Sequence, residues 1–290
     1  MLTVLSDGNG QMCNKILFQA NVLASACYRG YIVEYYAMKR YDSFCYSEPE
    51  LDKILKVRTE EPKRRLLFAR IWRKLMLKLN VESKKVIMVG TNHQESIKKA
   101  LSQDMLIKHR VFLYGWPFYD LEALRATGDM IRTYFAPTSE MKQKIQGLLC
   151  GIKKGKEDCL LIGIHLRKGD YKEWRNGEFY YTNDIYKQYM LDIALSMKER
   201  CIFVMFSNEP VETSEFIDSA YDIYVSHGTA YEDFHLMERC DYLVGPPSSF
   251  SGLASFFGKV PRYMMMNGTR KFDSKDLHIW LEETNTWGDT

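Results

Sequence analysis

The stretch that decides the fold is 159-CLLIGIHLRKGDY-171. Its first eight residues are mostly hydrophobic strand formers, which is typical of a buried parallel strand. At the end of this strand His165, Arg167 and Lys168 bring three potential cations close to one glycine. Because α/β proteins bind ligands in the loops at the carboxyl ends of parallel strands, the cluster predicts an anion site.

Polar residues also follow two other predicted strands in the same half of the chain. Ser207 and Asn208, in the sequence FSNEP, lie at the end of the strand CIFVMFSN, and the sequence GPPSSFSG follows DYLV. A helix beginning around Ser251 would offer free N–H groups to a phosphate, while Arg167 supplies a planar, permanently charged fork. Since these loops share one edge of a parallel sheet, together they fit an anionic diphosphate.

Strand and helix patterns alternate on both sides of this stretch. Strands at 1–6 and 31–37 flank a helix at 10–30, and two further strands are predicted at 85–90 and 110–115. Alternation continues beyond residue 159, which predicts a second parallel sheet. The Gly/Lys-rich segment 151–158 is the predicted interdomain hinge. The chain is therefore predicted to be an α/β protein with domains at 1–152 and 153–290.

Composition excludes several functional classes. A net charge of +3 in 290 residues does not indicate a nucleic-acid binder. Seven scattered cysteines without a C-x-x-C pair favour reduced thiols, and hence a cytoplasmic protein, over a disulfide or zinc framework. No segment approaches the length of a membrane span. The basic amphipathic helix predicted at 62–80 packs on the first sheet or contacts an anionic membrane surface peripherally.

These motifs resemble those of the fucosyltransferase superfamily, particularly the α-1,2-fucosyltransferases. HLRKGDY is similar to their H-x-R-x-G-D-Y element, FSNEP to their second element, and DFHLMERCDYLVGPPSSFSGLASFFG to their third. The protein O-fucosyltransferases share a similar S-S-F segment. The chain departs from the family at Pro247, where Asn is usual, and at Gly252 and Leu253, which replace a tryptophan pair.

The resemblance implies a GT-B fold, with two Rossmann-like domains facing a central cleft. The amino-terminal domain would serve the glycan acceptor, and the carboxyl-terminal domain would bind the nucleotide sugar, expected to be GDP-fucose. It further implies an inverting transferase of polysaccharide or glycan biosynthesis that needs neither a metal nor another cofactor. The sequence has no Asp-x-Asp element of the kind that holds a divalent ion against a diphosphate.

The predicted site residues have structural alternatives. Arg167 and His165 are the predicted catalytic residues, although an arginine can form a surface ion pair and a histidine can cap a strand. Lys168 occupies a position that the motif leaves open, and Asp170 is assigned to ordering the turn. The remaining candidates are assigned to substrate binding: Asn9, Gln11, Asn14, Ser207, Asn208, Asp233, Ser248, Ser249, Phe250 and Ser251.

Some of these assignments leave two readings open. The three serines could cap a helix or bind phosphate, since both uses involve the same free N–H groups. Asp233 could cap a helix or, as the resemblance suggests, hold the guanine or ribose. The rival functions are transfer of another sugar, such as xylose or rhamnose, and non-catalytic carbohydrate binding by the same fold.

Overall fold

The computed structural model describes residues 1–4, 10–36, 38–58, 71, 86–90, 101, 110–114, 118–266 and 271–282. The chain forms two compact units, Met1–Ala136 and Pro137–Thr290. The division precedes helix α8 (Ser139–Lys153), whereas the predicted boundary at 152 would place nearly all of that helix in the first unit. The reason is that α8 packs on helix α10 (Ala230–Met237) of the second unit. The predicted helix at 62–80 lies almost entirely outside the described residues.

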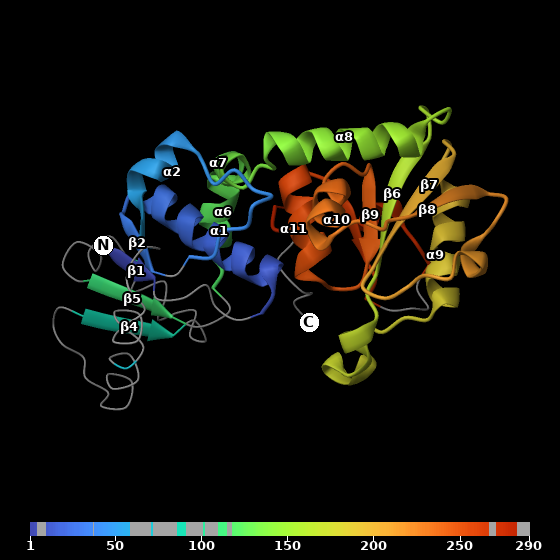
Figure 1. The fold of residues 1–290 in the computed structure, drawn as a ribbon. Helices are drawn as coiled ribbons and strands as arrows, with labels where there is room; N and C mark the ends of the chain where they lie inside the picture. Colours follow the sequence, from blue (N-terminus) through green and yellow to red (C-terminus); the bar gives the residue numbers. More distant parts are fainter. Residues whose placement is uncertain are drawn as a thin grey trace. The chain divides into compact units, whose positions relative to one another are not determined.

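The first unit contains a five-stranded sheet in the order β3-β2-β1-β5-β4 (Figure 1). The described strand pairs in it are parallel. The sequence pattern predicts four of these strands and the long helix, but not β3 and the short helix before it. The elements of this unit are β1 (Leu2–Val4), α1 (Met12–Arg29), β2 (Val33–Tyr36), α2 (Pro49–Ile54), β3 (Leu55–Arg58), β4 (Val86–Gly90), β5 (Arg110–Tyr114), α6 (Leu121–Ala126) and α7 (Gly128–Tyr134).

The second unit contains a six-stranded sheet in the order β11-β10-β9-β6-β7-β8. Its strands are parallel except β11, which runs antiparallel to β10. With α8 and α10, the unit comprises β6 (Leu160–Leu166), η1 (Gly169–Lys172), η2 (Trp174–Gly177), α9 (Asn183–Ser196), β7 (Cys201–Ser207), η3 (Thr213–Phe216), β8 (Tyr221–Val225), β9 (Tyr242–Gly245), α11 (Ser249–Gly258), β10 (Arg262–Met264), η4 (Ser274–Asp276) and β11 (Leu277–His278).

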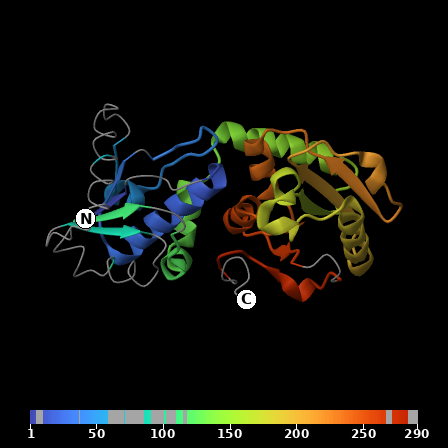
Figure 2. The ribbon, with the colours of Figure 1, turned by 90° about the horizontal axis from the view of Figure 1, so that it is seen from below.

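This strand order places a topological switch point between β6 and β9. From β6 the chain proceeds outward through β7 to β8, then returns to the other side of β6 at β9 and proceeds outward again through β10. Helix α9 consequently lies on one side of the sheet, and α10 and α11 lie on the other (Figures 1 and 2). The connections that follow β6 and β9 therefore diverge to opposite faces. In open α/β sheets, ligands bind at this point, outside the carboxyl ends of the strands.

The core of the second unit explains why its strands have continuous hydrophobic patterns. Residues 161–166 of β6 and 201–206 of β7 are buried, as expected for central parallel strands covered on both faces. The α9 face contributes large aromatic side chains, including the fully buried Tyr186. No described helix in either unit is long and apolar enough to cross a membrane.

Candidate functional site

The site is formed by the loops that follow β6 and β9. Gly169, in the loop after β6, has a φ of +56°, and a Cβ atom there would lie 2.8 Å from Nδ2 of Asn208. Gly245, the last residue of β9, packs so closely on β6 that an added Cβ would lie 2.9 Å from Cβ of His165. The positive φ at Gly169 and the close approach at Gly245 require glycine. They bring the β6, β7 and β9 loops together.

Arg167 is the predicted cation that stays at the edge of this site. Its side chain is 22% exposed, and Nη2 lies 3.0 and 2.9 Å from the two carboxylate oxygens of Asp170. The guanidinium carbon lies 5.2 Å from the centre of the Tyr171 ring, and Nε has no hydrogen-bond partner among the described residues. Asp170, expected to order the turn, therefore also orients Arg167.

The other two potential cations of the cluster do not act as cations at this edge. Lys168 is 9% exposed, and its ammonium donates a 2.6 Å hydrogen bond to the carbonyl of Tyr181. Burial lowers the pKa of Lys168. The Lys168 side chain is directed into an aromatic cluster that includes the rings of Tyr180 and Tyr186, in keeping with the position that the motif leaves open.

His165 is buried and neutral at physiological pH. Its side chain is 5% exposed, and Nδ1 lies 3.1 Å from the hydroxyl of Ser251. Burial, followed by the positive charges of Arg167 and Arg262, lowers the pKa of His165 to about 3. His165 therefore contributes a hydrogen bond between β6 and α11 rather than a positive charge.

Helix α11 presents its amino terminus directly after β9. It begins at Ser249, with Ser248 as the N-cap, and not around Ser251 as predicted. The hydroxyl of Ser248 accepts from the N–H of Phe250 at 3.2 Å. Ser248 and Ser251 are buried, whereas Ser249 and Phe250 are half-buried at the first turn. Both readings of the serines meet here, since Ser248 caps a helix whose first turn can also receive an anion.

The second predicted element, after β7, supports the loop after β6. The side-chain carbonyl of Asn208 accepts from the N–H of Lys168 at 2.9 Å, and the hydroxyl of Ser207 accepts from the N–H of Glu209 at 3.1 Å. Asn208 is exposed and Ser207 half-buried. Asn208 therefore holds the loop that carries Arg167.

Asp233 does not cap α10, which was one of its two readings. Thr229 and Glu232 form the capping box of that helix. The carboxylate of Asp233 instead accepts from the hydroxyl of Ser226 at 2.5 Å, next to the carboxyl end of β8. Burial raises the pKa of Asp233 to about 6. Its predicted contact with the guanine or ribose stays a prediction.

The amino-terminal candidates belong to the first unit. Asn9 lies outside the described residues. Gln11 is the exposed N-cap residue of α1, and its side chain makes no capping hydrogen bond. Asn14 lies half-buried in the first turn of the same helix, and a Cβ atom at Gly10 would lie 2.3 Å from its Nδ2. Gly10 requires glycine here, since it also has a φ of +93°.

Arg262 is a site residue that the sequence did not predict. It begins β10, is 4% exposed, and its Nη2 donates to the carbonyl of Pro246 at 2.5 Å. The hydroxyl of Tyr171 donates to the carbonyl of Pro247. Nothing in the sequence VPRYMMM distinguishes this arginine from a surface residue. The role of Arg262 becomes visible only in the fold, where its side chain supports the turn before α11.

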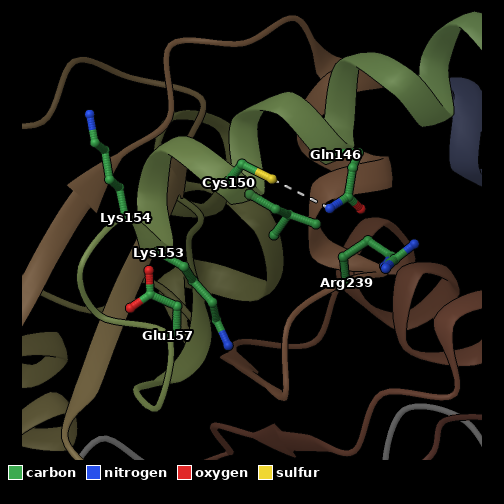
Figure 3. Close-up of a pocket in the computed structure, with 7 residues that line it drawn as sticks. Gln146, Cys150, Lys153, Lys154, Glu157 and Arg239 are labelled. Atoms are coloured by element: carbon green, nitrogen blue, oxygen red, sulfur yellow. Dashed lines mark hydrogen bonds between the residues drawn. The ribbon is translucent and has the colours of Figure 1, made fainter.

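A cavity of about 440 Å³ lies elsewhere in the second unit (Figure 3). It is lined by Gln146, Leu149, Cys150, Lys153, Lys154, Glu157 and Arg239. The α8 residues precede β6 and Arg239 precedes β9, so this cavity lies at the amino ends of the strands. It contains none of the predicted site residues.

Solved structures with this fold identify its class. The chain aligns with Arabidopsis thaliana FUT1, a mutant in complex with GDP, at a TM-score of 0.63 and 13% identity, covering 95% of this chain and 72% of that one. It aligns with the fucosyltransferase NodZ from Bradyrhizobium at 0.57 and 14%, covering 93% and 96%. POFUT1 in complex with GDP-fucose aligns at 0.54 and 13%, covering 88% and 93%. The two α/β units, each with a mainly parallel sheet, are those of the GT-B fold class.

The sequence model of glycosyl transferase family 11 matches residues 53–275, and the chain belongs to this family. Among curated relatives, galactoside alpha-(1,2)-fucosyltransferase 1 of Mus musculus is 26% identical over 194 residues, which cover 62% of this chain and 49% of the relative. The enzyme of the same name from Oryctolagus cuniculus is 25% identical over 194 residues, covering 62% and 50%. The chain thus spans about half the length of the curated relatives it matches.

Proposed function

We propose that the protein is an inverting, metal-independent fucosyltransferase that moves fucose from GDP-fucose to a hydroxyl group of a glycan acceptor. The observation that carries the proposal is at the β6–β9 switch point, where Tyr171 contacts the Arg167 guanidinium with its ring and the turn before α11 with its hydroxyl. The guanidinium and the amino terminus of α11 both favour a diphosphate. Family membership supports the reaction, and the solved relatives with GDP and GDP-fucose support the donor.

The chemistry assigned to the site is stabilisation of the leaving group. In the transfer, the bond between the sugar's anomeric carbon and the diphosphate oxygen breaks, and the oxygen of the acceptor hydroxyl bonds to that carbon. The hydroxyl proton passes to a base or to water, and GDP departs. Negative charge therefore accumulates on the diphosphate in the transition state. A guanidinium and helix N–H groups that meet this charge lower the barrier directly. Arg167, oriented by Asp170, supplies the guanidinium.

His165 is assigned a positioning role in this scheme. A buried imidazole with a pKa of about 3 is neutral at physiological pH and adds no positive charge to the diphosphate. Its hydrogen bond to Ser251 instead ties the end of β6 to the first turns of α11. His165 would thereby hold the two halves of the anion site in register.

The proposed compartment is the cytoplasm. None of the seven cysteines, all of which lie in the described ranges, forms a disulfide, including the exposed Cys45 and Cys150. Cysteines that stay outside disulfides are typical of proteins kept in a reducing compartment.

The test is a transfer reaction with GDP-fucose and a galactoside acceptor, run with EDTA and followed by NMR of the product. The proposal expects turnover in EDTA and an anomeric configuration opposite to that of the donor. Retained configuration, or activity abolished by EDTA and restored by a divalent ion, would contradict the mechanism. If only a xylosyl or rhamnosyl donor supports transfer, the proposed donor is wrong. If the protein binds glycan but no donor supports turnover, the proposed transferase activity is wrong.

A further inference from the structure

Arg262 is a buried cation without a carboxylate partner among the described residues. Other arginines of the chain have such partners: Arg29 pairs with Asp120, Arg132 with Asp129, and Arg200 with Asp222. Arg262 is more deeply buried than these three, and its charge-assisted hydrogen bond goes to the carbonyl of Pro246. Its Nε has no hydrogen-bond partner within the described ranges.

An uncompensated buried charge is costly to the folded protein. Moving a guanidinium out of water carries a large desolvation penalty, and one carbonyl offsets only part of it. Consistent with this, burial lowers the pKa of Arg262 to about 10. A protein that keeps such a residue without a counter-ion is suited to binding an anion nearby.

The position of the charge indicates where this anion binds. Pro246 and Pro247 form the turn between β9 and Ser248, the N-cap of the ten-residue helix α11. Neither proline has a backbone N–H, so their backbones can only accept hydrogen bonds. The Pro246 carbonyl accepts one from Arg262, and the Pro247 carbonyl accepts one from Tyr171. The field of Arg262 reaches the site: after burial and Arg167, its charge contributes to lowering the pKa of His165, and it opposes part of the rise that burial causes in the pKa of Tyr171.

We propose that Arg262 is a positioning residue of the donor site, and that its buried charge is the fixed counter-charge for the diphosphate at the amino terminus of α11. The inference rests on the proposed function. Arg262 acts from beneath the turn: its hydrogen bond fixes the Pro246 carbonyl, and its charge attracts the anion that α11 receives. Arg167, partly exposed and oriented by Asp170, supplies the contact from the side of β6.

A purely structural clamp would behave differently from a counter-charge. A clamp needs only an N–H group that reaches the Pro246 carbonyl, so a neutral donor could replace it. A counter-charge needs the positive charge and affects only ligands that carry phosphate. The two roles are therefore separable by the choice of substitution and of nucleotide.

The experiment measures the affinities of GDP and guanosine by calorimetry for wild type, Arg262→Gln and Arg262→Lys. Loss of the charge in Arg262→Gln should weaken GDP by about tenfold to 100-fold and leave guanosine unchanged. Arg262→Lys should recover most of the GDP affinity. The control is Arg239→Gln, which removes an arginine at the other edge of the sheet and should leave both affinities unchanged. Equal loss of GDP and guanosine, or no loss, would overturn the inference.

A measurement on the wild-type protein keeps the inference testable if Arg262→Gln does not fold. The Nε resonance of Arg262, observed by ¹⁵N NMR, should shift with GDP and stay unchanged with guanosine; an equal response to both would overturn the inference. If wild type does not bind GDP at all, the proposed function itself fails. If wild type binds GDP and Arg262→Gln binds it equally well, the counter-charge role of Arg262 is wrong and the proposed function still stands.

Discussion

At the scale of single residues, the Arg167 guanidinium is oriented by its contacts with the carboxylate of Asp170 and the ring of Tyr171. Arg167→Lys keeps the charge but loses the planar fork that can grip two phosphate oxygens. We expect turnover at saturating donor to fall by about 10²-fold or more, the usual loss for one such donor. Arg239→Lys is the matched control and should turn over like wild type. Near wild-type turnover by Arg167→Lys would remove Arg167 from the leaving-group site.

Lys168 gives the opposite prediction, because its ammonium is part of the core. Lys168→Ala leaves the Tyr181 carbonyl without its charged donor, so the free energy of unfolding should fall by about 1.5–3 kcal/mol. Lys172→Ala removes an exposed ammonium and should change it by no more than about 0.5 kcal/mol. Urea denaturation of both variants provides the measurement. Equal stability of the two would show that the buried contact contributes nothing.

His165 predicts a pH dependence of stability. Its pKa is about 3 in the folded protein and about 6.5 in the unfolded chain, so below pH 6.5 the unfolded chain binds a proton that the folded protein does not. The contribution is complete above pH 6.5, and the free energy of unfolding falls as the pH is lowered from 6.5 toward 3. His165→Asn should show a shallower decline over pH 6.5 to 4 in denaturation experiments. Asp233, whose pKa is raised, changes the free energy of unfolding with pH in the opposite direction. This change is the same in wild type and in His165→Asn, so it cancels when the two curves are compared. Parallel curves would mean that His165 is protonated in the folded state.

The sequence could predict that polar groups gather after β6, but not what each one does. A histidine, an arginine and a lysine at one strand end look alike as charges. Their roles depend on burial: the His165 imidazole faces α11, the Lys168 ammonium faces the aromatic cluster, and only Arg167 of the three stays partly exposed. Arg262 was missed for the same reason, because its partner carbonyl is 16 residues away in the chain.

At the scale of elements, helix α11 packs closely on a tryptophan from a distant part of the chain. Trp280, near the carboxyl end of the described chain, is buried against Gly252, where an added Cβ would lie 2.6 Å from the ring. The backbone N–H of Trp280 donates to the hydroxyl of Ser255 at 3.1 Å. The space beside Gly252 is thus filled by a tryptophan from a distant segment.

This packing predicts opposite effects of one substitution at two helical glycines. Gly252→Ala should destabilise the protein by about 1–3 kcal/mol, because overpacking against Trp280 exceeds the gain in helix propensity. Gly147→Ala, in α8 with no atom within 4 Å of the added Cβ, should stabilise by about 0.5–1 kcal/mol. Thermal unfolding of both variants measures the difference. A stabilising Gly252→Ala would show that the Trp280 contact is loose.

The main strands and helices were predictable because their hydrophobic patterns are long and regular. Strands β6 and β7 and helix α1 appear close to their expected bounds. The two-residue strand β11 and the short α2–β3 unit carry too few residues for a period to emerge. The start of α11 was misplaced by two residues, since Ser248 and Ser251 are both plausible caps and the turn geometry decides between them.

At the scale of the whole molecule, strand order gives the sequence motifs their meaning. The three motifs are far apart in the chain, and the order β10-β9-β6-β7-β8 brings their loops to the carboxyl edge of one sheet. Strand order is set by long-range packing, which no local pattern of residues reveals. The boundary between the units could not be read either, because the Gly/Lys-rich segment ends α8 and does not mark the division.

The central claim is that the switch point of the second unit binds a guanosine diphosphate, and that Arg167 and α11 neutralise the diphosphate without a metal. The most direct test is a thermal-shift series with GDP, UDP, dTDP and CDP, each in the presence and absence of EDTA. At 100 times its dissociation constant, GDP should stabilise the protein by about 2.7 kcal/mol, equally with and without EDTA. Stabilisation by UDP but not GDP, or a GDP effect that EDTA abolishes, would contradict the account.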